Sequence, residues 1–267
     1  MAADEHSLTL VERLGSRLSD GLRGRLLSES DPGQRLGIID EALCPPEPQL
    51  LDTSVLQNLD WVDRKLEEAE AGVNWDDEAV AELKGRFGKD LAADLIDLGT
   101  LYKQFEHYGS YPWLICKAAV DEASVLQSEK GCRLRQLLSF LSGHQEDWHD
   151  DSFPGIAKSL LLSRSGSRVS PLILRALGVT SVEELCGVGG PLSFLQDGGD
   201  RAIVSHALLA NIPAILTTDR RTFWMQRGKI RDLGVEVLRP SEILGLYRPY
   251  WDAVDYEFAR RRAEPRP

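Results

Sequence analysis

Two aspartates in this sequence each end an apolar stretch that has the length of a short strand. Asp52 follows QLL within PQLLDTSVL, and Asp219 follows PAILTT. An isolated buried charge is costly, so a carboxylate at the end of a buried strand must be hydrogen-bonded, paired with a cation or bound to a metal ion. Both aspartates are therefore candidate functional residues. The alternative is that each only caps a turn or a helix.

Two further acids have comparable positions. Glu122 belongs to a helix predicted after the apolar stretch WLIC, and Asp200 opens the predicted helix GGDRAIVSHALLANI, with Asp197 nearby. Taken alone, Glu122 would be a solvated helix residue and Asp200 would complement the helix dipole. Four carboxylates that lie close together raise one another's pKa values, and a hard divalent cation relieves this. Oxygen ligands favour Mg²⁺ or Mn²⁺ over zinc, so the pattern indicates metal-assisted chemistry on a phosphate ester.

The elements that must position these acids alternate between strands and helices. Strands are predicted at QLLD, PWLIC, PAILTTD and GVEVLRP, and each is followed by a helix or a loop with a short helix. Such alternation predicts an α/β fold with a parallel sheet, in which the carboxyl ends of the strands share one edge. We expect Asp52 and Asp219 at that edge, where open α/β sheets place their sites.

Additional helices are expected around this framework. The pattern predicts a short helix over 21–28, a helix after Asp52 with Thr53 or Ser54 as its N-cap, helices over 74–88 and 89–109, mostly short helices between 133 and 195, and a closing helix at SEILGLY. The predicted organisation has three parts. These are a helical N-terminal extension (1–47), an α/β domain with helical insertions (48–247), and a C-terminal helix with an Arg-rich tail (248–267).

Three of these blocks resemble the PIN domain. LLDTSVL resembles its opening strand, WLICKAAVDEASVL its middle block, and DRAIVSHALLANIPAILTTDRRTFW its closing block, so the resemblance covers roughly residues 48 to 244. It implies a PIN-like three-layer α/β/α fold with a central parallel sheet, here with additional helices. The chain departs from the compact members in its helical preface, in the helices before the second strand, and in the long stretch between Glu122 and Asp200.

The resemblance also implies an activity. The metal-binding and catalytic acids of the family fall on Asp52, Glu122, Asp200 and Asp219, which implies an Mg²⁺- or Mn²⁺-dependent ribonuclease, as in many toxins of toxin–antitoxin pairs. The family's polar residue after the first aspartate would be Ser54, and Thr218 would orient water or phosphate. Water activated by the divalent cation would attack the phosphodiester in line and leave a 5′-phosphate. An antitoxin-like protein or a second copy of the chain would be the protein partner.

A basic segment adjoins the last acid. DRRTFWMQRGKIR contains Arg220 and Arg221 as candidate substrate-binding residues, together with further bases and two aromatic residues. Guanidinium groups and aromatic rings suit RNA, through phosphate contacts and base stacking. The alternative is a solvated face whose aromatic residues pack inward. Arg260, Arg261 and Arg262 in the tail would add only a general attraction for phosphate.

Two competing interpretations are less favoured. His144 and His149 in HQEDWHDD suggest zinc, but their spacing is poor and no cysteine is close, so a polar loop is expected there. A phosphatase of the HAD type is excluded, because that family needs an aspartate where this chain has Ser54. His206 is expected to be a packed histidine rather than a ligand.

Composition limits the class of protein. The chain has 267 residues, a net charge of −11 and 42% hydrophobic residues, which argues against a protein that coats nucleic acid non-specifically. Its four cysteines form no CxxC pair, and no signal peptide or membrane-spanning stretch is evident. A cytoplasmic protein is expected. The rival to the nuclease is a PIN-like non-catalytic binding or regulatory module, with residues 1–47 or the helices of 130–195 as its partner surface.

Overall fold

The computed structural model describes residues 10, 14, 18–43, 46–68, 77–108, 111–125, 129–147, 155–162 and 169–263. They divide into two compact units. Unit 1 comprises Met1–Pro46 with Ile243–Pro267, and unit 2 comprises Glu47–Glu242. Among the described residues, no helix combines the length and the apolar character that crossing a membrane requires.

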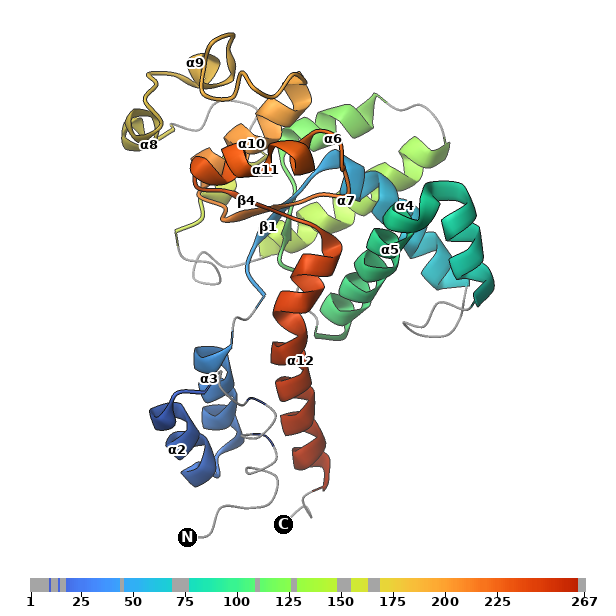
Figure 1. Cartoon of the computed structure of the whole chain (residues 1–267), viewed down its shortest axis with the longest axis vertical. Helices are drawn as coiled ribbons and strands as arrows, with labels where there is room; N and C mark the ends of the chain where they lie inside the picture. The colour runs from blue at the N-terminus through green and yellow to red at the C-terminus, as the bar shows by residue number, and fades with distance from the viewer. Residues whose placement is uncertain are drawn as a thin grey trace. The chain divides into compact units, whose positions relative to one another are not determined.

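Unit 2 contains a small parallel sheet, as the alternating pattern predicts. Its strands are β1 (Gln49–Leu51), β2 (Trp113–Leu114), β3 (Ala214–Leu216) and β4 (Glu236–Leu238), in the order β2-β1-β3-β4 (Figure 1). Leu51 is in register with Leu216, so β1 and β3 end side by side. The residues that follow these two strands therefore meet at one edge. The expected α/β class and the four strands are confirmed.

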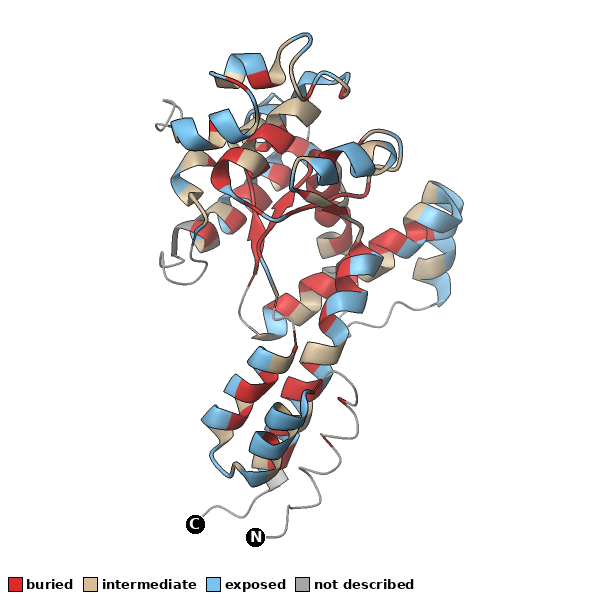
Figure 2. Ribbon diagram, turned by 60° about the vertical axis from the view of Figure 1, so that its left-hand side comes forward, coloured by how far each residue is buried: buried red, intermediate tan, exposed pale blue. Residues whose placement is uncertain are grey.

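Helices flank the sheet in unit 2. They are α4 (Thr53–Glu68), α5 (Asp77–Tyr108), α6 (Lys117–Ser124), α7 (Glu129–Asp147), the 3₁₀ turn η3 (Lys158–Leu160), α8 (Pro171–Ala176), α9 (Val182–Cys186), α10 (Gly198–Ala210) and α11 (Phe223–Asp232). Contacts place α7 against β2, α10 against β3 and α11 against β4. Buried residues, red on the ribbon of Figure 2, concentrate in the strands and in the parts of the helices that pack around them.

Helix boundaries follow local chemistry where a special residue marks them. The two helices predicted over 74–88 and 89–109 form α5, and Gly88 divides them with a φ of 79°, a conformation that costs glycine little. The prediction of mostly short helices between 133 and 195 is wrong for its first part, because α7 is a 19-residue helix. Two Leu residues of that helix, Leu134 and Leu138, are buried on its inner face.

Two smaller predictions need correction. His144 lies in α7 rather than in a polar loop, and its ring packs 4.5 Å from that of Phe140; His149 lies outside the described residues. The helix after Asp52 begins at Thr53, so neither Thr53 nor Ser54 is its N-cap. The position before the helix belongs to Asp52, whose carbonyl accepts from the N–H groups of Val55 and Leu56.

Unit 1 joins the two ends of the chain. It contains α2 (Asp20–Ser28), α3 (Pro32–Ala42) and α12 (Pro240–Ala263) from Ile243 onward. The short helix predicted over 21–28 is confirmed by α2, whereas the closing helix is far longer than SEILGLY. Most of the first 17 residues of the expected helical extension lie outside the described residues, although Leu10, Leu14 and Leu18 are buried.

A buried charge network lies in unit 1. Glu257 is fully buried and accepts from Arg35 at 2.9 Å and from Arg260 at 2.7 Å. The prediction that Arg260 adds only a general attraction for phosphate is therefore wrong, because its side chain is buried and paired within α12. An exposed ion pair contributes little to the free energy of unfolding, but a buried carboxylate depends on its arginine partners.

Candidate active site

Asp52 lies directly after β1 and is 4% exposed. Its Oδ2 accepts from the hydroxyl of Ser54 and, at 2.7 Å, from that of Thr217. Burial raises the pKa of Asp52; the two hydroxyls oppose this, and the charge of Asp219 adds to it. The carboxylate is thus fixed by two hydroxyl donors at the end of a central strand.

Asp219 lies three residues after β3, in the loop that leads into α11. Its Oδ1 accepts from the N–H of Arg221 at 2.8 Å, and its Oδ2 accepts from the N–H groups of Thr222 at 2.9 Å and Phe223 at 3.4 Å. Burial raises the pKa of Asp219, but these N–H donors outweigh it and hold the pKa below its ordinary value. Asp219 therefore caps the turn that leads into α11 and also keeps a negative charge near Asp52.

Asp200 occupies the first turn of α10, behind the N-cap residue Asp197. Burial and then, in this order, the charges of Asp52, Asp197, Asp219 and Glu122 raise the pKa of Asp200 to about 7. A carboxylate is affected by such charges only when they are close to it. Asp52, Asp219 and Glu122 therefore lie within electrostatic reach of Asp200.

Glu122, the fourth acid, belongs to α6, and its side chain is exposed. It accepts a hydrogen bond of 2.9 Å from the hydroxyl of Thr53, the residue next to Asp52. The adjacent acid, Asp121, forms an ion pair with Lys117 on the same helix. Of these two neighbouring acids, Glu122 is the one that the fold directs to the end of β1.

Ser54 and Thr218 link the ends of the two central strands. The N–H and the hydroxyl of Thr218 lie 3.2 and 3.1 Å from Ser54 Oγ, and Asn58 Nδ2 donates to Thr218 Oγ1 at 2.8 Å. Thr217, which is fully buried, also accepts from the Asp219 N–H at 2.9 Å. Sequence reasoning missed Thr53, Asn58 and Thr217. Their only signal was their closeness in sequence to Asp52 or Asp219.

The two arginines after Asp219 have different surroundings. Arg220 contacts α5, where it donates to the carboxylate of Asp94 at 3.0 and 3.2 Å and pairs with Asp90 at 3.0 Å. Arg239 also pairs with Asp94, which is fully buried. Arg221 is exposed. Arg220 thus ties the Asp219 loop to α5, while Arg221 is available to solvent. Sequence reasoning also missed Asp94, although an acid within the apolar face of the helix predicted over 89–109 could have marked it.

The rest of the basic segment is partly ordered by stacking. The guanidinium of Arg227 lies 3.8 Å from the centre of the Trp224 ring, and that of Arg239 lies 5.3 Å from it. Phe223 is fully buried, so one of the two aromatic residues packs inward as the alternative interpretation expected. Half-buried Trp224 remains at the surface with its cationic neighbours.

The group of four acids has the composition of a hard-metal site. Within the part of the chain that the structure describes, no Lys or Arg forms an ion pair with any of the four. Among those same residues, no group of three or more His, Cys, Asp or Glu side chains has an arrangement that would hold a metal ion as it stands. The donors are all carboxylate oxygens, which fit Mg²⁺ or Mn²⁺. Comparison with family models, curated proteins and solved structures finds no match for the chain.

Proposed function

We propose that this chain is a metal-dependent endoribonuclease with a PIN-like three-layer fold. Asp52, Glu122, Asp200 and Asp219 hold Mg²⁺ or Mn²⁺ in this proposal, and an RNA phosphodiester is the substrate. The observation that supports it most is the pKa of Asp200, which burial and four neighbouring carboxylates raise to about 7. A group of acids without a compensating base is what a divalent cation stabilises.

A bound divalent cation would supply positive charge to the transition state and lower the pKa of a water molecule. The chain's own residues do the rest. Ser54 and Thr217 fix Asp52, and the N–H groups of the α11 turn fix Asp219. The carboxylates repel one another without a counter-charge, and Asp200 would give up its proton to act as a ligand when a divalent cation is bound. Exposed Arg221 contacts a substrate phosphate.

The test is cleavage of a mixed-sequence single-stranded RNA in Mn²⁺, beside a DNA strand of the same sequence. Glu122→Gln is expected to lower the rate by about 100-fold or more, because one metal ligand loses its charge. Asp121→Asn is the matched control. It removes the same charge from the neighbouring residue, whose partner is Lys117, and should keep activity near wild type. Asp52→Asn and EDTA should each abolish cleavage.

Calorimetric titration with Mn²⁺ gives an independent readout. The proposal predicts saturable binding that Asp52→Asn abolishes. Absence of Mn²⁺ binding by the folded wild type would exclude the metal site. Binding without cleavage of any RNA or DNA would exclude the general nuclease and leave the acids as a metal-binding site only.

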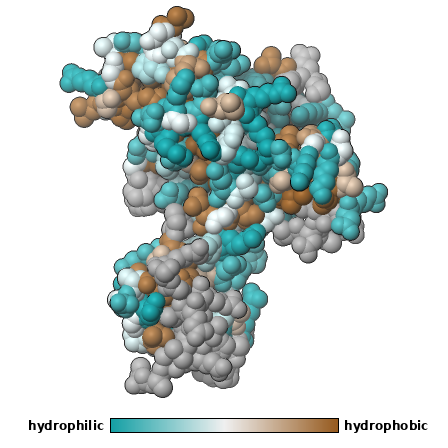
Figure 3. Space-filling model, in the orientation of Figure 1, coloured by the Kyte–Doolittle hydropathy of each residue, from teal (hydrophilic) through white to brown (hydrophobic). Residues whose placement is uncertain are grey.

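The second candidate is a non-catalytic interaction module. It is favoured by apolar side chains that gather on the surface over α8 and α9, among them Leu172 and Val188, which are 72% and 104% exposed (Figure 3). Helix α9 contacts α10, which carries Asp200, so a partner bound there would lie near the acids. An antitoxin-like protein or a second copy would fit this surface. Leu172→Asp would weaken that association without altering Mn²⁺ binding.

A further inference from the structure

A cavity in unit 2 lies away from the four acids. It has a volume of about 400 Å³ and lies between α4, α5 and α7. Asp63, which lines it, comes about three turns of α4 after Asp52, a separation of about 16 Å along the helix axis. The lining rings of Tyr102 and Phe140 contact Trp113, the first residue of β2, and Tyr111, which precedes β2, so the cavity lies toward the amino ends of the strands. The cavity is therefore distinct from the candidate active site.

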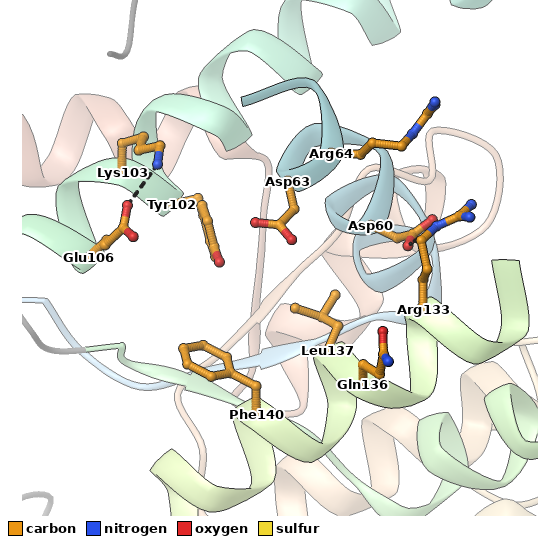
Figure 4. A pocket seen from close by; sticks show the side chains of 10 residues that line it. All are labelled: Asp60, Asp63, Arg64, Tyr102, Lys103, Glu106, Arg133, Gln136, Leu137 and Phe140. Atoms are coloured by element: carbon orange, nitrogen blue, oxygen red, sulfur yellow. Dashed lines mark hydrogen bonds and ion pairs between the residues drawn. The ribbon is translucent and has the colours of Figure 1, made fainter. Parts of the chain in front are cut away.

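The charged side chains of this cavity largely neutralise one another. They are Asp60, Asp63, Arg64, Lys103, Glu106 and Arg133. Lys103 pairs with Glu106 at 2.8 Å and Arg133 with Asp60 at 3.2 Å. The carboxylate of Asp63 points toward the middle of the cavity, whereas Arg64 extends away from it (Figure 4). A ligand at the centre therefore meets the carboxylate of Asp63.

Aromatic rings form the wall opposite Asp63. Phe140 is 42% exposed, and its ring packs edge-on against Tyr111 with 5.5 Å between centroids. Tyr102 stacks on Trp113 at 6.2 Å. Burial and then the charge of Asp63 raise the pKa of Tyr102, so its hydroxyl stays protonated near that carboxylate. The carboxylate of Asp63 thus faces a phenol and an accessible ring face.

We propose that this cavity binds an organic cation. An alkylammonium or guanidinium group lies on Asp63, and its hydrocarbon stem lies along Phe140 and Tyr102. A carboxylate beside aromatic faces is the combination that attracts such groups, and the volume is that of a small-molecule site. An anion would be repelled by Asp63 and would have to break existing ion pairs to reach Lys103 or Arg133. The net charge of −11 also favours cations near the protein.

The test is calorimetric titration of the full chain, in saturating Mg²⁺ so that the active-site acids are occupied. The probes are putrescine and the neutral molecule of similar length, 1,4-butanediol. Putrescine is expected to bind saturably and butanediol is not. Asp63→Asn should weaken putrescine binding by about tenfold or more, since a charge-assisted contact is lost. Asp232→Asn removes an equal charge from an exposed position of α11 and should leave binding unchanged.

Phe140→Leu provides a second test, because its ring is exposed and its loss does not threaten the core. It keeps an apolar wall but removes the aromatic face, and several-fold weaker binding is expected. Equal binding of butanediol, wild-type affinity in both variants, or no saturable heat with putrescine would each overturn the proposal. A model arginine side chain, N-acetyl-arginine methylamide, identifies the source. Tighter binding than putrescine assigns the cavity to a partner's basic side chain, and weaker binding assigns it to a free polyamine.

Discussion

Thr217 connects the carboxylate of Asp52 to the backbone of Asp219 through one hydroxyl. That hydroxyl donates to Asp52 at 2.7 Å and accepts from the Asp219 N–H at 2.9 Å. Removing this buried hydroxyl would take one of two hydroxyl donors from Asp52 and leave the Asp219 N–H without its acceptor. The residue therefore supports the site without itself carrying charge.

Thr217→Val should lower the free energy of unfolding by about 1–3 kcal/mol, because the side chain keeps its shape and loses only the hydroxyl. Urea denaturation measures this. Thr100→Val is the matched control. The Thr100 hydroxyl bonds only to the Ile96 carbonyl of its own helix, so the change should stay within about 0.5 kcal/mol. Equal effects of the two substitutions would show that the Thr217 hydroxyl has no special role.

The acids also predict a pH dependence. The pKa of Asp200 is about 7 in the folded chain, against 3.8 for an unperturbed aspartate, so the folded protein holds a proton that the unfolded chain has lost. Stability from this group is therefore complete below about pH 4 and is lost as the pH rises through about 7. Thermal unfolding in EDTA should show this decline between pH 5 and 7, and Asp200→Asn should flatten it.

The affinity for Mn²⁺ should rise with pH, whereas stability falls. A cation binds the ionised carboxylate, so Mn²⁺ affinity should rise by up to about tenfold per pH unit below pH 7 and level off above it. Calorimetry at several pH values measures the slope. A flat affinity from pH 5.5 to 7.5 in the wild type would contradict the assignment of Asp200 as a ligand.

At the scale of elements, the Asp219 loop is attached to α5 through Arg220. Asp94 is fully buried and receives both Arg220 and Arg239, so two loops at the carboxyl edge converge on one acid of one helix. Such a buried carboxylate is stable only with its cations in place. The arginine beside it in sequence, Arg221, is exposed and makes no such contact in the described structure.

Replacing Arg220 should therefore mainly affect stability, and replacing Arg221 should mainly affect RNA binding. Arg220→Ala should lower the free energy of unfolding by about 1–3 kcal/mol, because Asp94 loses one of its two partners. Arg221→Ala should change stability by less than about 0.5 kcal/mol and weaken RNA binding. Denaturation and RNA titration measure the two properties. Loss of RNA binding in Arg220→Ala alone would place the substrate contact on Arg220, as the sequence also allowed.

At the scale of the whole molecule, the two ends of the chain belong to one unit. The buried pair Arg35–Glu257 joins positions 222 residues apart. Glu257 accepts from two arginines, so its neutralisation removes the charge of a carboxylate on which two buried cations depend. The N-terminal helices α2 and α3 thus depend on residues of α12 for their charge balance.

Glu257→Gln should therefore destabilise unit 1 by about 3–5 kcal/mol. Hydrogen exchange should report faster exchange in α3 while the strands of unit 2 keep their protection. Asp252→Asn, at an exposed position of the same helix, is the control and should leave exchange in α3 unchanged. Equal loss of protection in both units would mean that they unfold together.

The sequence by itself determined the strands, most of the helices and the two aspartates that follow strands. Those features depend on short-range causes, namely apolar runs, helical periodicity and the conformational freedom of Gly88. Only the tertiary structure decided which polar groups meet. Asp94 with Arg220, Glu257 with Arg35 and Thr217 with Asp52 are far apart in the chain. Burial then sets the pKa of Asp200, and burial is a property of the folded chain that no local pattern contains.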